Sequence, residues 1–123
     1  MDHNESIAVE VVAAQADVRL ERHEPGLVLA VAGEIDLTTA DRLRTIFDWA
    51  VQNARTVLVI DLSDVTFIGS MGLRLLLETH NQAKPRVVRI VAPHSVNRRA
   101  IEITSLDQVL WMFTDLTAAL EAT

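Results

Sequence analysis

The sequence predicts an α/β fold with a mixed sheet of four to five strands, which opens with a hairpin and is then largely parallel, and with about four helices. Strand-like and helix-like segments alternate beyond residue 35, which is typical of a sheet layered with helices. Residues 57–61 are apolar and rich in β-branched side chains, as in a strand covered on both faces. Half of the 123 residues are hydrophobic, so the chain can bury the core of one domain.

The first segments predict a hairpin. Residues 1–16 are interpreted as an N-terminal arm or an edge strand, and residues 17–123 as the domain. Residues 18–22 alternate between apolar and polar, which indicates a half-buried strand. Residues 24–26 read Glu-Pro-Gly and predict a turn. The continuous apolar run at 27–32 completes the hairpin as its second strand.

An amphipathic helix follows the hairpin. Thr38 or Thr39 is expected as its N-cap, with the charge of Asp41 in the first turn. Apolar residues then recur every three or four positions and predict the buried face of the helix. These residues are Ala40, Leu43, Ile46, Phe47, Ala50, Val51 and Ala54.

The alternation continues to the end of the chain. After the strand at 57–61 and a short link, residues 70–83 predict a second helix. Lys84-Pro85 ends it, because proline disfavours helix in the residue before it. The remaining segments are a strand at 87–92, a helix from Pro93 or Ser95 to about residue 103, a short strand at 109–112 and a helix at 114–121.

Charge and composition exclude several functions. The net charge is −6, which argues against nucleic acid and against an anionic membrane surface as partners, because both attract clustered Lys and Arg. The chain has no cysteine, so it forms no disulfide. Its acidic first residues lack the basic region of a signal peptide, and its longest apolar run is far shorter than the ~20 residues of a membrane span. We therefore expect a cytoplasmic protein.

No metal or nucleotide site is predicted. The histidines, at positions 3, 23, 80 and 94, do not have the spacing of metal ligands. His80 is expected instead on the inner face of its helix, bonded to a backbone group. The glycines of residues 68–72 do not match the phosphate-binding glycine patterns, so no cofactor is expected.

Ser70 is a weak candidate for a catalytic nucleophile. The nucleophile pattern Gly-x-Ser-x-Gly requires glycine at position 68, where the chain has Ile68. His80 would lie roughly 15 Å along the same helix, too far to act as a base. His94 is not excluded by the sequence, although nothing links it to Ser70. We therefore predict that the chain is not an enzyme, and local sequence alone favours Ser70 as a helix N-cap.

Two segments resemble the STAS domain family. Residues 33–40 read Gly-Glu-Ile-Asp-Leu-Thr-Thr-Ala and are similar to the Gly-Glu-Leu-Asp segment that opens the first helix of these domains. Residues 61–73 resemble the family's phosphorylation segment, which usually ends Phe-Ile/Met-Asp-Ser-x-Gly-Leu. The resemblance runs from about Asp17 to the C-terminus and implies the STAS fold, with Ser70 at the phosphoacceptor position.

The chain departs from this pattern at Gly69, where the family usually has Asp. Loss of that carboxylate slows phosphorylation if the kinase uses it to position the serine. Alternatively, its loss removes repulsion toward a phosphate on Ser70. The sequence leaves both interpretations open.

The resemblance implies an anti-sigma factor antagonist that regulates sigma-factor-dependent transcription by partner switching. Its partners would be an anti-sigma factor, which is a serine kinase of the histidine-kinase-like ATPase type, and a serine phosphatase. The kinase would bring the ATP, and phosphorylation would switch the antagonist off. The alternative is a non-phosphorylated STAS docking module of a lipid-transport or signalling complex.

The partner surface is predicted to surround Ser70. Met71 and Leu75 are included because they are expected to turn away from the helix stripe that contains Leu73 and Leu76. Phosphorylation at this helix terminus is expected to leave the fold intact, since the amides and dipole there accept an anion. The predicted partner-binding residues are Asp36, Thr38, Gly69, Ser70, Met71 and Leu75.

Overall fold

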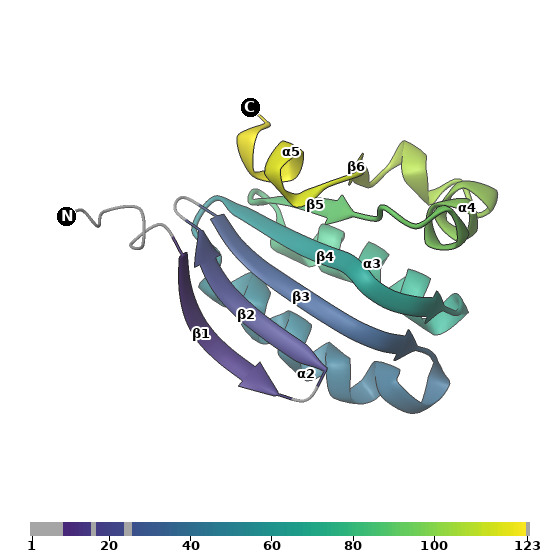
Figure 1. Cartoon of the computed structure of the whole chain (residues 1–123), viewed down its shortest axis with the longest axis horizontal. Helices are drawn as coiled ribbons and strands as arrows, with labels where there is room; N and C mark the ends of the chain where they lie inside the picture. The colour runs from purple at the N-terminus through teal and green to yellow at the C-terminus, as the bar shows by residue number, and fades with distance from the viewer. Residues whose placement is uncertain (1–8, 16, 24–25, 123) are drawn as a thin grey trace.

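The computed structural model describes residues 17–23 and 26–122, and the backbone of residues 9–15. The described residues form one six-stranded sheet with the strands in chain order (Figure 1). The strands are β1 (Val9–Gln15), β2 (Val18–His23), β3 (Gly26–Ile35), β4 (Val57–Ile68), β5 (Val87–Val91) and β6 (Trp111–Phe113). The first three are antiparallel neighbours, and β3 to β6 are parallel. The predicted fold class is confirmed, with six strands where four or five were expected.

The sixth strand comes from the N-terminal segment. Two alternatives were open for residues 1–16, an arm or an edge strand. Residues 9–15 pair with β2 as an edge strand, whereas residues 1–8 and 16 lie outside the described residues. The predicted turn at residues 24–26 also lies largely outside them, although β2 and β3 pair as the predicted hairpin.

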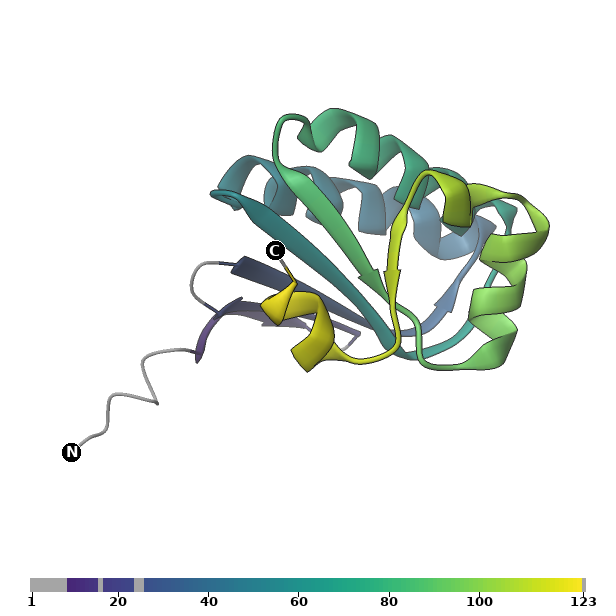
Figure 2. The same ribbon diagram turned by 90° about the horizontal axis from the view of Figure 1, so that it is seen from above.

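Helices cover both faces of the sheet. Figure 2 shows α2 and α3 side by side on one face, with α5 on the opposite face. The parallel strands β3, β4 and β5 are connected through α2 and α3, as the alternation of segments predicted. The helices are α2 (Leu37–Asn53), α3 (Ser70–Ala83), α4 (Ser95–Ile103) and α5 (Leu116–Glu121), with a 3-10 turn at Leu106–Gln108.

Two hydrophobic cores explain the continuous apolar runs. Alternate residues of β3 and β4, such as Leu29 and Ile60, are fully buried in the main core, which α2 and α3 cover. The residues between them, such as Val28 and Val59, point to the other face and pack in a smaller core with Ala119 of α5. A strand buried on both faces has no polar positions to alternate with, which is why its sequence is apolar throughout.

The structure differs from the prediction in β4 and near the C-terminus. β4 is twelve residues long and includes most of the segment that was expected to link residue 61 to the second helix. The last strand and helix begin at Trp111 and Leu116, two residues later than predicted. The predicted bounds of α3, residues 70–83, are confirmed. In the described part of the chain, no helix is both long and apolar enough to span a membrane.

Candidate partner-docking site at the ends of β3 and β4

The site lies where β3 and β4 end side by side. Ile35 and Ile68, the last residues of these parallel strands, are opposite each other in the register. The backbone N–H of Gly69 donates to Ile35 O over 2.8 Å and ties the two chain segments together. Because α2 begins at Leu37 and α3 at Ser70, both helix N-termini open at this edge of the sheet (Figure 1).

Ser70 is the first residue of α3 and is exposed. Within the described residues, no hydrogen bond reaches its hydroxyl. The interpretation of Ser70 as an N-cap is therefore wrong, because Gly69 holds the N-cap position with extended backbone and no side-chain cap. The hydroxyl of Ser70 is thus exposed at the surface and makes no hydrogen bond that stabilises the described part of the chain.

Gly72 fixes the position of Ser70. A Cβ added at Gly72 would lie 2.7 Å from both Ile35 Cγ2 and Ile68 Cγ1. Such a distance is far below van der Waals contact, so only glycine lets the first turn of α3 rest directly on the ends of β3 and β4. The serine is therefore held on rigid elements.

Gly69 is not required by the backbone. Its φ is −91° and its ψ is −175°, a conformation that any residue adopts. An added Cβ would lie 3.3 Å from Phe67 Cε2, which needs only a small shift of an exposed ring. The aspartate that the family usually has at this position would therefore fit, and its absence is a difference of chemistry rather than of space.

Asp36 caps α2. Its carboxylate accepts hydrogen bonds from the N–H groups of Thr38 and Thr39, over 3.0 and 3.3 Å, and the Thr39 hydroxyl accepts from the N–H of Asp36 over 3.0 Å. The prediction that Thr38 or Thr39 is the N-cap is wrong, because the chain leaves the extended conformation only after Asp36. A hydrogen bond from the Thr38 hydroxyl, together with the two N–H groups, lowers the pKa of Asp36 from its usual value.

Leu75 does not belong to a partner surface. Its side chain is only 1% exposed and is among the largest fully buried side chains of the main core. The prediction is wrong because α3 packs against both the sheet and α2, so its buried stripe is wider than Leu73 and Leu76 alone suggested. Met71 is half-buried, with part of its surface facing out beside Ser70.

Two apolar residues at this edge were not predicted. Leu37, directly after the cap of α2, is 74% exposed, and Phe67, near the end of β4, is 49% exposed. Large apolar side chains that are exposed at the same edge of a sheet are candidates for a protein interface. No local pattern indicates the exposure of Leu37, because it lies three residues before Ala40 and so continues the apolar spacing of α2.

The site contains no catalytic constellation. In the part of the chain that the structure describes, no histidine or carboxylate is hydrogen-bonded to Ser70. His94 Nε2 lies 2.6 Å from Ser63 O, and His80 is half-buried without the expected backbone hydrogen bond. No cluster of three or more potential metal ligands occurs among the described residues. Among the described residues, none is hydrogen-bonded to the hydroxyl of Ser70 in a way that would activate it as a nucleophile.

The chain belongs to the STAS domain family, whose model matches residues 17–119. The match covers the sheet from β2 to β6, the helices α2, α3 and α4, the first four residues of α5 and the whole candidate site.

The chain is also similar to proteins that are named as anti-sigma factor antagonists. Over 104 residues, 84% of this chain and 85% of the relative, the chain is 40% identical to the anti-sigma-F factor antagonist RsfB of Mycobacterium tuberculosis. The crystal structure of an anti-sigma factor antagonist from Mycobacterium paratuberculosis matches with a TM-score of 0.80 and 36% identity, over 84% of this chain and 89% of that one. The phosphorylated form of the Bacillus cell fate determinant SpoIIAA matches with a TM-score of 0.58 and 18% identity, over 90% and 96% of the two chains, a likeness of fold alone.

Proposed function

We propose that this chain is an anti-sigma factor antagonist, a non-enzymatic cytoplasmic switch that regulates sigma-factor-dependent transcription. The observation that carries the proposal is the exposed Ser70 hydroxyl at the start of α3, without a hydrogen bond in the described part of the chain. The names of the two mycobacterial relatives support the same function.

The docking surface consists of Ser70 and the exposed groups around it. Leu37 and Phe67 supply apolar contact area, and Met71 adds to it beside the serine. Asp36 and Gly69, the N-caps of α2 and α3, also belong to the surface, together with Thr38 in the first turn of α2. The Thr38 hydroxyl donates a 2.7 Å hydrogen bond to Asp36 Oδ1, which holds both side chains in place. Exposed apolar residues within a polar rim are typical of surfaces that bind a protein partner.

Phosphorylation switches this surface off. The anti-sigma factor, a serine kinase of the histidine-kinase-like ATPase type, transfers the γ-phosphoryl group of its ATP to Ser70 Oγ. The new Oγ–P bond replaces the bond to ADP, and the hydroxyl proton leaves to a base on the kinase. About 1.5 to 2 negative charges then stand between the apolar contacts and disrupt docking by charge and desolvation. A serine phosphatase hydrolyses the ester and restores the surface.

The fold tolerates this charge. Ser70 is exposed, and the first N–H groups of a helix and its dipole accept an anion. Phosphorylation therefore acts on the interface and not on the core.

The decisive experiment measures binding to a panel of anti-sigma factor kinases by titration calorimetry. Ser70→Ala should bind and resist phosphorylation, whereas Ser70→Glu should bind at least ~10-fold more weakly while its thermal unfolding stays near that of the wild type. Thr117→Glu is the matched control, because Thr117 is exposed in the first turn of α5 on the opposite face of the sheet. The proposal would be refuted if both glutamate variants bound equally well, or if Ser70→Glu lost its cooperative thermal unfolding.

Gly69 supports a second candidate, a STAS docking module of a lipid-transport or signalling complex that is never phosphorylated. In that case the surface around Ser70 would bind its partner constitutively. An in-vitro phosphorylation assay with the same kinases separates the two candidates, since only the first predicts that a phosphate appears on Ser70 and is absent from Ser70→Ala.

A further inference from the structure

Three arginines lie on the two helices that begin at the docking site, and two of them are firmly engaged. Arg42 donates to both carboxylate oxygens of Asp17, over 2.9 and 2.6 Å. Arg44 of α2 is bonded to Glu78 of α3. A phosphate on Ser70 could recruit either one only by breaking an established ion pair.

Arg74 is different. Its side chain is 69% exposed, and its contact is a 3.4 Å approach of Nε to Glu78 Oε2. This distance exceeds the ~2.7–3.2 Å of an N–H···O hydrogen bond, so the contact is a weak surface ion pair. Arg74 can leave Glu78 without stranding that carboxylate, because Glu78 keeps Arg44 as its partner.

The position of Arg74 on α3 brings it close to Ser70. The two residues are four apart in the same helix, and side chains at this spacing lie on one face with their Cβ atoms about 5–6 Å apart. An acidic group four residues before a basic one is the favoured order for such a pair. The planar guanidinium of arginine matches the geometry of phosphate oxygens, with two parallel hydrogen bonds.

We propose that Arg74 holds the phosphate of phospho-Ser70, exchanging its loose contact with Glu78 for a bidentate pair with the phosphate. The inference rests on the proposed function, since it assumes that Ser70 is the phosphoacceptor. It adds a second effect to the switch: phosphorylation places negative charge on the docking surface and engages the positive charge of Arg74, whose side chain is exposed in the unmodified chain.

The test uses protein with phosphoserine incorporated at position 70 during translation, so that no kinase is needed. The second pKa of the phosphate is measured by ³¹P NMR at low salt. A nearby guanidinium favours the dianion, so Arg74→Gln should raise this pKa by roughly 0.3 unit or more. Arg74→Lys, which keeps the charge but not the fork, should raise it less.

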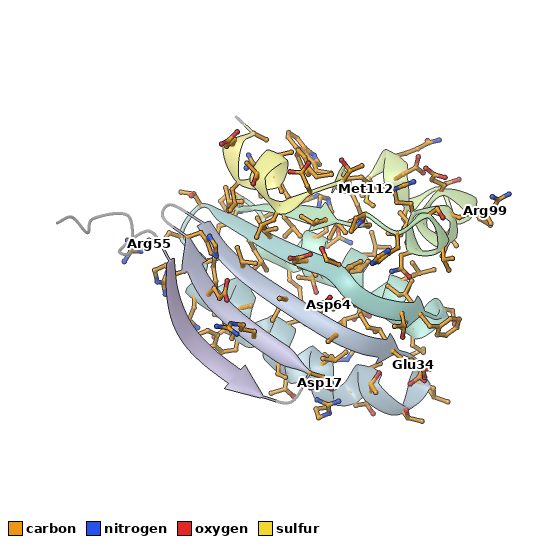
Figure 3. The ribbon with its side chains drawn as sticks, viewed as in Figure 1. Asp17, Glu34, Arg55, Asp64, Arg99 and Met112 are labelled. Carbon is orange, nitrogen blue, oxygen red and sulfur yellow. The ribbon has the colours of Figure 1, made fainter. Side chains whose placement is uncertain are left out.

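Arg55→Gln is the matched control. It removes the same charge at the opposite end of β4, which Figure 3 shows far from the end marked by Glu34. The twelve residues of β4 separate it from Ser70 by roughly 35 Å, which exceeds the screening length of about 30 Å even at 0.01 M salt. Equal phosphate pKa values in Arg74→Gln and Arg55→Gln would overturn the inference.

A reciprocal variant tests the exchange. Glu78→Gln removes the carboxylate that competes for Arg74 and should lower the phosphate pKa further; an unchanged or raised value would count against the exchange. These titrations do not depend on kinase binding. An unchanged phosphate pKa in Arg74→Gln would therefore contradict only the role of Arg74. If the unmodified chain bound none of the kinases, the proposed function itself would be contradicted.

Discussion

The two halves of β4 have different surroundings. Residues 57–61 pair with β3 on one side and with β5 on the other, without a shift in register. Residues 62–68 pair with β3 alone, and two register shifts interrupt that pairing. In Figure 3, Asp64 marks this second half, which extends beyond β5.

Side chains replace β5 along the second half. Asn97 of α4, which is 1% exposed, donates from Nδ2 to Val65 O over 2.8 Å, and His94 Nε2 contacts Ser63 O. A buried backbone carbonyl without a partner is costly, so a strand that outruns its neighbour needs such donors. Both halves of β4 contribute to the main core, for example through Ile60 and Leu62. The irregular half is in addition supported by side chains of the α4 region and carries the chain to Gly69 and Ser70.

The largest expected effect concerns α3, whose first turn rests on Ile68 at the end of the second half. Leu75→Ala should lower the free energy of unfolding by about 2–5 kcal/mol, because it leaves a cavity in the main core. Chemical denaturation measures this change. Met71→Ala, at a half-buried position beside Ser70, should cost less than about 1.5 kcal/mol but should weaken partner binding. The reverse pattern would place Leu75, and not Met71, at the interface.

Asn97→Ala tests the comparison directly. Removing the amide leaves Val65 O without its donor, which should cost about 1–3 kcal/mol. Hydrogen exchange should accelerate at residues 62–68 more than at residues 57–61. His94→Ala, which removes an exposed side chain from the same half, is expected to have a smaller effect. Uniform acceleration along β4 would show that the two halves unfold as one unit.

Gly69→Asp should have a small effect of opposite sign. The extended backbone accepts a side chain, aspartate is a better N-cap than glycine, and the unfolded chain loses flexibility. We expect a gain of about 0.5 kcal/mol in the free energy of unfolding. Thermal unfolding of the variant, with Gly72→Ala as the contrasting case, measures it. Gly72→Ala should destabilise by about 1–3 kcal/mol, because its Cβ meets Ile35 and Ile68. If Gly69→Asp lowered the free energy of unfolding as much as Gly72→Ala does, the ring of Phe67 would be unable to shift away from the new Cβ.

The smallest effect is a pH dependence at the other end of α3. Burial, together with the charge of Lys84, lowers the pKa of His80 from its usual value. The unfolded chain therefore binds a proton at higher pH than the folded chain, so stability is full above about pH 6.5 and declines as the pH falls below it. His80→Gln should reduce this slope in thermal melts between pH 7 and pH 5. If stability depended on pH equally steeply in the variant, groups other than His80 would be responsible for the dependence.

Much of the fold could be predicted from local patterns in the sequence. The apolar stripe of α2 was predicted because helical periodicity places its residues on one face, and Ala40, Leu43 and Phe47 are indeed buried. The bounds of α3 followed from Gly69 before it and Lys84-Pro85 after it. The cap of α2 was misplaced by two or three residues, because Asp36, Thr38 and Thr39 are all good caps and only the backbone conformation selects among them.

The sequence by itself determined the order of strands and helices and the position of Ser70 at a strand-to-helix junction, since periodicity and turn residues act over short distances. Only the tertiary structure decided that Leu75 is buried, that Leu37 and Phe67 are exposed at the edge where β3 and β4 end, and that Asn97 supports β4. These outcomes depend on which elements pack against one another, and such contacts join residues that are far apart in the chain.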